Sequence, residues 1–62
     1  MVEYIITIRD GSVIRGQTDR AYWLAFCDEL IGDPWAHLVS SENGSEYWIR
    51  TGCVSNTWSK PV

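Results

Sequence analysis

The sequence predicts an α+β protein in which a small antiparallel sheet, in ββαββ order with room for a fifth strand, carries one helix packed on one face. Asp10-Gly11 and Asn43-Gly44 follow segments rich in β-branched and aromatic residues, and both pairs are typical of hairpin turns. Only residues 18–31 place apolar residues at helical spacing. Strands joined by tight turns are antiparallel, and a single helix can cover only one face of their sheet.

The first hairpin is predicted from residues 2–9, whose sequence VEYIITIR favours a strand, and from residues 12–17, which return. A two-residue turn would pair Ile6 with Arg15 and mix apolar and polar faces. A three-residue loop with Gly11 in the left-handed region pairs Ile6 with Ile14 instead. We prefer the second register because a shift of one residue exchanges the two faces. It places Tyr4, Ile6, Ile8 and Ile14 on one face and Ile5, Thr7, Val13 and Arg15 on the other.

The helix is predicted over residues 18–31, with Thr18 or Asp19 as the capping residue. Gly32 is placed for the C-terminal cap, and Pro34 blocks any continuation. The buried stripe follows the spacing i, i+3, i+4, i+7 and i+8. Its members are Trp23, Phe26, Cys27, Leu30 and Ile31.

The second half of the chain is predicted to add two or three strands. Residues 35–41 form a third strand, the Asn43-Gly44 turn follows, and residues 45–50 return. Thr51-Gly52 interrupts the run, and residues 53–58 resume as a short fifth strand. We expect a single α+β domain over residues 1–58 and a flexible C-terminal tail over residues 59–62.

Composition and charge limit the partners. The chain of 62 residues has five basic and eight acidic side chains, for a net charge of −3. Duplex nucleic acid is bound mainly by neutralising phosphates, so we expect no such partner. A protein with a basic surface suits this charge better. The start of the chain does not resemble an export signal, and the longest apolar run is too short for a membrane span. We therefore expect a cytoplasmic protein without a membrane partner.

No combination of side chains indicates catalysis, a metal site or a cofactor. His37 is the only histidine, and a nucleophile or acid would have to lie beside it for catalysis. A zinc site usually needs four ligands, and two cysteines with one histidine at unpaired spacing are too few. Cys27 and Cys53 are expected to be buried free thiols. We therefore expect that the protein is not an enzyme.

The candidate binding residues are those that the single helix leaves uncovered. Ile5 and Val13 lie on the second face of the predicted sheet, and either Tyr47 or Trp48 joins them because adjacent strand residues point to opposite faces. We expect this face to be covered by a second copy, giving a homodimer, or by a partner protein.

The acidic residues Asp28, Glu29 and Asp33 lie near the C-terminal end of the helix, where negative charge is unfavourable. They either form a solvated face or present an acidic patch to arginines of a partner.

The size, the acidity, the Asp10-Gly11 and Asn43-Gly44 turns and the single helix together resemble the small acidic α+β proteins of phages and mobile elements. That group includes anti-CRISPR proteins and other inhibitors of host defence. The resemblance implies a protein that occupies a partner's surface in the host cytoplasm. The alternative is an oligomeric nucleotide or single-stranded nucleic-acid binder that stacks bases on its four tryptophans.

Overall fold

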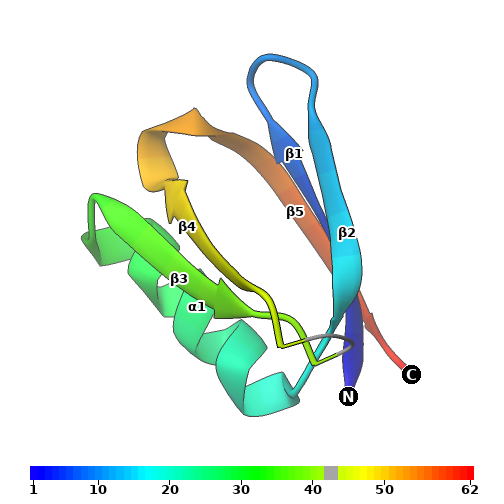
Figure 1. The fold of residues 1–62 in the computed structure, drawn as a ribbon. Coiled ribbons are helices and arrows are strands. Elements are labelled where there is room, and N and C mark those ends of the chain that lie inside the picture. The colour runs from blue at the N-terminus through cyan, green and yellow to red at the C-terminus, as the bar shows by residue number, and fades with distance from the viewer. Residues whose placement is uncertain (42–43) are drawn as a thin grey trace.

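The computed structural model describes residues 1–41 and 44–62 of the chain. These described residues form one α-helix, five strands and a short 3₁₀ helix, and the predicted α+β class and ββαββ(β) order are confirmed (Figure 1). In chain order the elements are β1 (Val2–Ile8), β2 (Val13–Thr18), α1 (Arg20–Gly32), β3 (Trp35–Val39), β4 (Glu46–Arg50), η1 (Thr51–Cys53) and β5 (Val54–Pro61).

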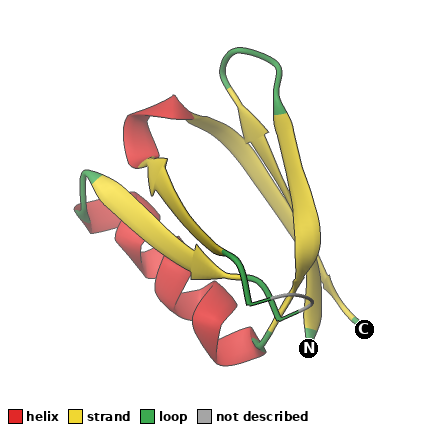
Figure 2. Cartoon of the chain, in the orientation of Figure 1, coloured by secondary structure: helices red, strands yellow, loops and turns green. Residues whose placement is uncertain are grey.

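The strands are divided between two antiparallel sheets. One has the strand order β2-β1-β5, and the other is the hairpin β3-β4. The helix packs against β3, so α1 and the β3–β4 hairpin together form a layer that faces the three-stranded sheet (Figure 2). The core lies between the two layers. Its buried apolar side chains are Val2, Tyr4, Ile6, Trp23, Phe26, Ala36, Leu38 and Ile49.

The first hairpin has the register predicted from the sequence. Ile6 pairs with Ile14, and the Ile8 amide donates to the Ser12 carbonyl over 2.8 Å. Gly11 has a φ of 96°, the left-handed conformation that the three-residue loop requires. Asp10 fixes the same turn because its Oδ1 accepts a 2.8 Å bond from the Ser12 amide, and bonding to Ser12 lowers the pKa of Asp10.

Three aromatic rings join the two layers. The Tyr4 ring stacks on Trp23 with centroids 5.3 Å apart, and Trp23 stacks on Phe26 with centroids 5.4 Å apart. Tyr4 lies opposite Gly16, and a Cβ atom at Gly16 would come within 2.7 Å of the Tyr4 hydroxyl. The missing side chain of Gly16 therefore makes room for the first ring of the stack.

The helix differs from its prediction in two respects. Trp23 and Phe26 are buried and Cys27 packs against the core, but Ile31 is 89% exposed, so its place in the stripe is wrong. At 3.6 residues per turn, Ile31 lies about 110° around the helix from the direction midway between Trp23 and Phe26. Gly32 is the last helical residue rather than a left-handed cap. The capping position is Asp33, whose amide donates to the Glu29 carbonyl over 2.9 Å.

The second hairpin is shorter than predicted. β3 ends at Val39, and the Ser40 amide then donates to the Ser45 carbonyl over 2.8 Å. Gly44 has a φ of 71°, the left-handed conformation that favours glycine. Asn43, the other half of the predicted turn signal, lies outside the described residues.

Residues 59–61, which were expected to belong to a flexible tail, are part of strand β5. β5 does not stop at Trp58 but runs to Pro61, where it is paired with Val2, and the Val62 amide donates to the Met1 carbonyl over 3.1 Å. β1 is the central strand of its sheet, because β2 pairs with one of its edges and β5 pairs with the other. Within the described part of the chain, no helix has both the length and the apolar character needed to cross a membrane.

Candidate functional site

The outer face of the β3–β4 hairpin is the most aromatic exposed surface that the register creates. Ala36, Leu38 and Ile49 point into the core, so the residues between them point outward. We call this outward surface the aromatic face. It comprises Trp35, His37 and Val39 from β3 and Glu46, Trp48 and Arg50 from β4.

His37 and Trp48 lie directly opposite each other at the centre of this face. The His37 amide points away from β4 and donates over 3.3 Å to Oε2 of Glu29 on the helix. The two residues therefore form a non-hydrogen-bonded pair, the type in which opposite side chains are closest. Their rings stack with centroids 4.3 Å apart and an angle of 18° between planes.

The carboxylate of Glu46 holds the imidazole of this stack in place. His37 Nε2 lies 3.0 Å from Oε1 of Glu46, a hydrogen bond that becomes an ion pair when the imidazole is protonated. Trp48 is thus held against a fixed imidazole on one side while 64% of the residue remains exposed. This combination of order and exposure suits a side chain that anchors a partner.

A second tryptophan widens the aromatic face. Trp35 lies opposite Arg50 and is 50% exposed. Trp35 and Trp48 occupy diagonal positions, roughly 7–8 Å apart in an antiparallel pair and within reach of one ligand or side chain. Glu46 and Arg50 lie at opposite ends of β4 on this face, so the aromatic centre is flanked by one negative and one positive charge.

The residues expected to share one uncovered face do not come together. Ile5 and Val13 lie on the outer face of the three-stranded sheet, whereas Trp48 lies on the outer face of the other sheet. Tyr47 points inward and packs against the core. The expectation of one continuous face is wrong because the strands form two sheets whose inner faces share a core, so their outer faces point away from each other.

The three acidic residues near the end of the helix, Asp28, Glu29 and Asp33, do not form a single exposed patch, because they make different contacts. Glu29 is half-buried and accepts the His37 amide bond, while the carbonyl of Asp33 accepts a 2.7 Å bond from the Thr51 hydroxyl. Asp28 is exposed. Two of the three residues therefore connect the helix to β3 and to η1.

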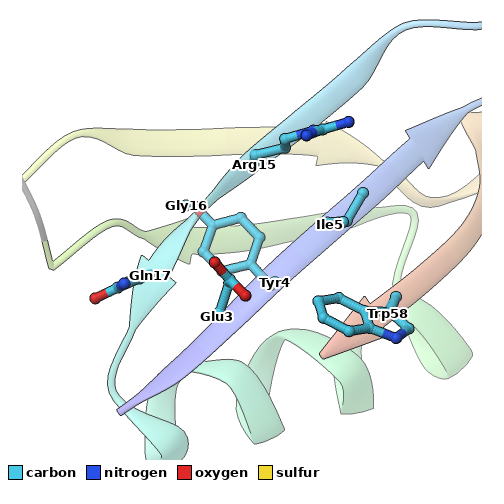
Figure 3. Close-up of a pocket in the computed structure, with 7 residues that line it drawn as sticks. All are labelled: Glu3, Tyr4, Ile5, Arg15, Gly16, Gln17 and Trp58. Atoms are coloured by element: carbon cyan, nitrogen blue, oxygen red, sulfur yellow. The ribbon is translucent and has the colours of Figure 1, made fainter. Parts of the chain in front are cut away.

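A hollow lies on the outer face of the three-stranded sheet, away from the aromatic face (Figure 3). Arg15 and Trp58 both pair with Ile5, and Figure 3 shows them on either side of it. The hollow has a volume of about 380 Å³, within the range of small-molecule sites. Its lining residues are Glu3, Tyr4, Ile5, Arg15, Gly16, Gln17 and Trp58.

The cysteines are both free, but they are not both buried. Cys27 is half-buried on the helix, and burial together with the neighbouring Asp28 charge raises the pKa of its thiol. Cys53 is exposed because it lies in the surface turn η1, so the expected burial of this residue is wrong. In residues 1–41 and 44–62, no three side chains of the metal-ligating types gather to hold an ion.

Several residues of these two surfaces were not selected from the sequence. Trp35, His37 and Arg50 could have been found by alternation, since each follows or precedes a core position on its strand. Trp58 and Arg15 could not have been joined in this way, because only the pairing of both strands with β1 brings them to one surface.

No family model, curated protein or solved structure matches this chain.

Proposed function

We propose that this chain is a non-enzymatic binding protein that occupies the surface of a partner protein through the aromatic face. The observation that carries the proposal is the exposed, ordered ring of Trp48, stacked on His37. Exposed tryptophans are over-represented among the residues that dominate binding energy. Because the stack and the Glu46 contact already restrict the indole, less conformational freedom is lost when a partner binds.

The form of the aromatic face supports a protein partner over nucleic acid. Its only cation is Arg50, and the chain has a net charge of −3, so a phosphate backbone would gain little there. An apolar pocket in a partner could accept Trp48 and Trp35, with a basic group opposite Glu46 and an acidic group opposite Arg50. The basic group agrees with the expectation of a partner that has a basic surface.

The finer form of the proposal is a phage-type inhibitor that acts in the host cytoplasm. Its support is the resemblance in size, acidity and element order to small inhibitors of that kind. A second copy of the chain could also cover the aromatic face and give a homodimer, because a two-fold interface uses the same surface twice. Two exposed tryptophans leave apolar surface in contact with water in a free monomer, and either a partner protein or a second copy of the chain would cover that surface.

The test is an affinity capture compared across matched variants. The wild-type chain, Trp48→Ser and Tyr22→Ser would each be immobilised and exposed to the same bacterial lysate, with retained proteins quantified by mass spectrometry. Tyr22 is an exposed aromatic residue of the helix, 49% accessible, and is the matched control. Sedimentation of the free chain, from micromolar to millimolar concentration, measures self-association of the same three proteins.

We expect a partner that the wild type and Tyr22→Ser retain and that Trp48→Ser loses, or a dimer with the same dependence. Circular dichroism would show that Trp48→Ser remains folded, as its exposed position predicts. If every retained protein is indifferent to Trp48 and the chain stays monomeric, the aromatic face is not the binding surface.

A further inference from the structure

The hollow on the three-stranded sheet combines charge, a flat ring and an apolar floor in one row. Arg15, Ile5 and Trp58 stand side by side across β2, β1 and β5. In the neighbouring row, Gln17, Glu3 and Lys60 stand in the same order. The aromatic face has no part in this surface, so an inference about the hollow is independent of the proposed function.

The charges around the hollow leave one cation uncompensated. Lys60 Nζ lies 3.5 Å from Oε1 of Glu3, so these two groups neutralise each other. In the described part of the chain, Arg15 takes part in no ion pair and is exposed. The Arg15 guanidinium is therefore an uncompensated positive charge at the hollow, on a protein whose net charge is −3. A guanidinium in this state is suited to bidentate binding of a phosphate.

The other end of the row offers a stacking surface. Trp58 is 44% exposed, and the Lys60 ammonium lies 5.9 Å from its ring centroid. Stacking of a base on an aromatic side chain contributes to binding whatever the base, because every base has a π-face. Ile5 lies between the ring and the guanidinium and provides an apolar floor.

We propose that this hollow binds a nucleoside monophosphate, with the base stacked on Trp58, the ribose over Ile5 and the phosphate on Arg15. Two strand spacings separate β2 from β5, about 10 Å in total. A simple aromatic acid, whose anion is attached directly to its ring, is too short to reach both ends. The ribose of a nucleotide supplies the missing length, and the Glu3 carboxylate is a suitable acceptor for its hydroxyls.

The test uses the indole N–H signals of the four tryptophans in ¹H–¹⁵N spectra, each assigned by a single substitution. The wild-type chain is titrated separately with AMP, adenosine, inorganic phosphate and a dA6 oligonucleotide. The same AMP titration is repeated on Arg15→Gln and on Arg20→Gln. The second variant removes the same charge from the helix, outside the hollow.

We expect a saturable shift of the Trp58 indole with AMP and no shift of the Trp35 and Trp48 indoles. Adenosine and phosphate should each bind at least about tenfold more weakly than AMP, because each lacks one of the two contacts. Arg15→Gln should weaken AMP binding about tenfold or more, and Arg20→Gln should leave it unchanged.

Three results would overturn the inference. The first is the absence of any saturable shift of the Trp58 indole in the wild-type chain up to about 20 mM AMP. A dissociation constant above that concentration would be far weaker than those of typical ligands. The second is equal affinity for AMP and adenosine, which would show that Arg15 takes no phosphate. The third is binding of the oligonucleotide alone, which would identify a single-strand surface instead.

Discussion

The imidazole of His37 lies nearly parallel to the indole of Trp48, with ring centroids 4.3 Å apart. The arrangement follows from the backbone, because the His37 amide bonds to the helix and leaves the pair in its closely spaced form. Glu46 also holds the imidazole through the 3.0 Å hydrogen bond at Nε2. An exposed tryptophan is thereby ordered before any partner arrives.

The stack predicts a specific spectroscopic and energetic signature. Trp48→Leu should remove the ring-current shift of the His37 side-chain protons and lower the free energy of unfolding by about 0.5–1.5 kcal/mol, the usual worth of an aromatic pair. Proton NMR and urea denaturation measure the two quantities. Trp35→Leu is the matched control, because Trp35 lies opposite Arg50 rather than His37. Unchanged His37 shifts in Trp48→Leu would show that the rings do not stack in solution.

The core stack of Tyr4, Trp23 and Phe26 predicts a large loss of stability when Phe26, at its end, is truncated. Phe26 is fully buried and stacks on Trp23, so Phe26→Ala should cost about 3–5 kcal/mol of unfolding free energy. That is most of the stability expected for so short a chain. Leu24→Ala, at an exposed position of the same helix, should change it by less than about 0.5 kcal/mol. Equal melting temperatures for the two variants would contradict the burial of Phe26.

The close contact between Gly16 and Tyr4 predicts that Gly16→Ala destabilises the fold. Gly16→Ala places a Cβ atom 2.7 Å from the Tyr4 hydroxyl and 3.0 Å from Cζ of a ring that Trp23 holds in place. We expect a loss of about 1–3 kcal/mol, typical of overpacking. Gly32→Ala has open space around it and should be neutral or stabilising by up to about 1 kcal/mol. Thermal unfolding compares them, and a Gly16→Ala variant at least as stable as Gly32→Ala would exclude the close contact.

The two thiols should differ in reactivity. Burial and Asp28 raise the pKa of Cys27, so at any pH below that value less of it is the reactive thiolate. We expect a disulfide reagent at pH 8 to modify exposed Cys53 faster than Cys27, and the rate at Cys27 to keep rising as the pH increases. Cys27→Ser and Cys53→Ser, each with one remaining thiol, separate the two rates. Without reductant, the denatured wild type should show two thiols, and finding none would indicate a disulfide.

Local patterns predicted those parts of the fold that local forces decide. The turn at Gly11 and the alternation of apolar residues along β1 determine the register of the first hairpin, since any other pairing mixes the faces. The spacing of Trp23 and Phe26 likewise identified the buried side of the helix. Ile31 was misplaced because spacing alone does not show where the layer opposite the helix ends.

Those local patterns do not predict which strands pair when they are far apart in the sequence. The division of the strands into two sheets depends on β5 returning to pair with β1 across more than forty residues of chain. Without that pairing, Trp48 and Ile5 were assigned to one surface, and Trp58 was not connected with Arg15. The hollow therefore depends on a long-range pairing that local patterns do not predict, whereas the aromatic face lies on the local β3–β4 hairpin.

Hydroxyl-radical footprinting of the four tryptophans, free and in complex with the captured partner, tests the aromatic face most directly. The free chain should be oxidised at Trp48, Trp35 and Trp58, which are exposed, and little at buried Trp23. In the complex, or at concentrations where a dimer forms, Trp48 and Trp35 should be protected while Trp58 remains reactive. Undiminished oxidation of Trp48 in a complex that protects other residues would contradict the account.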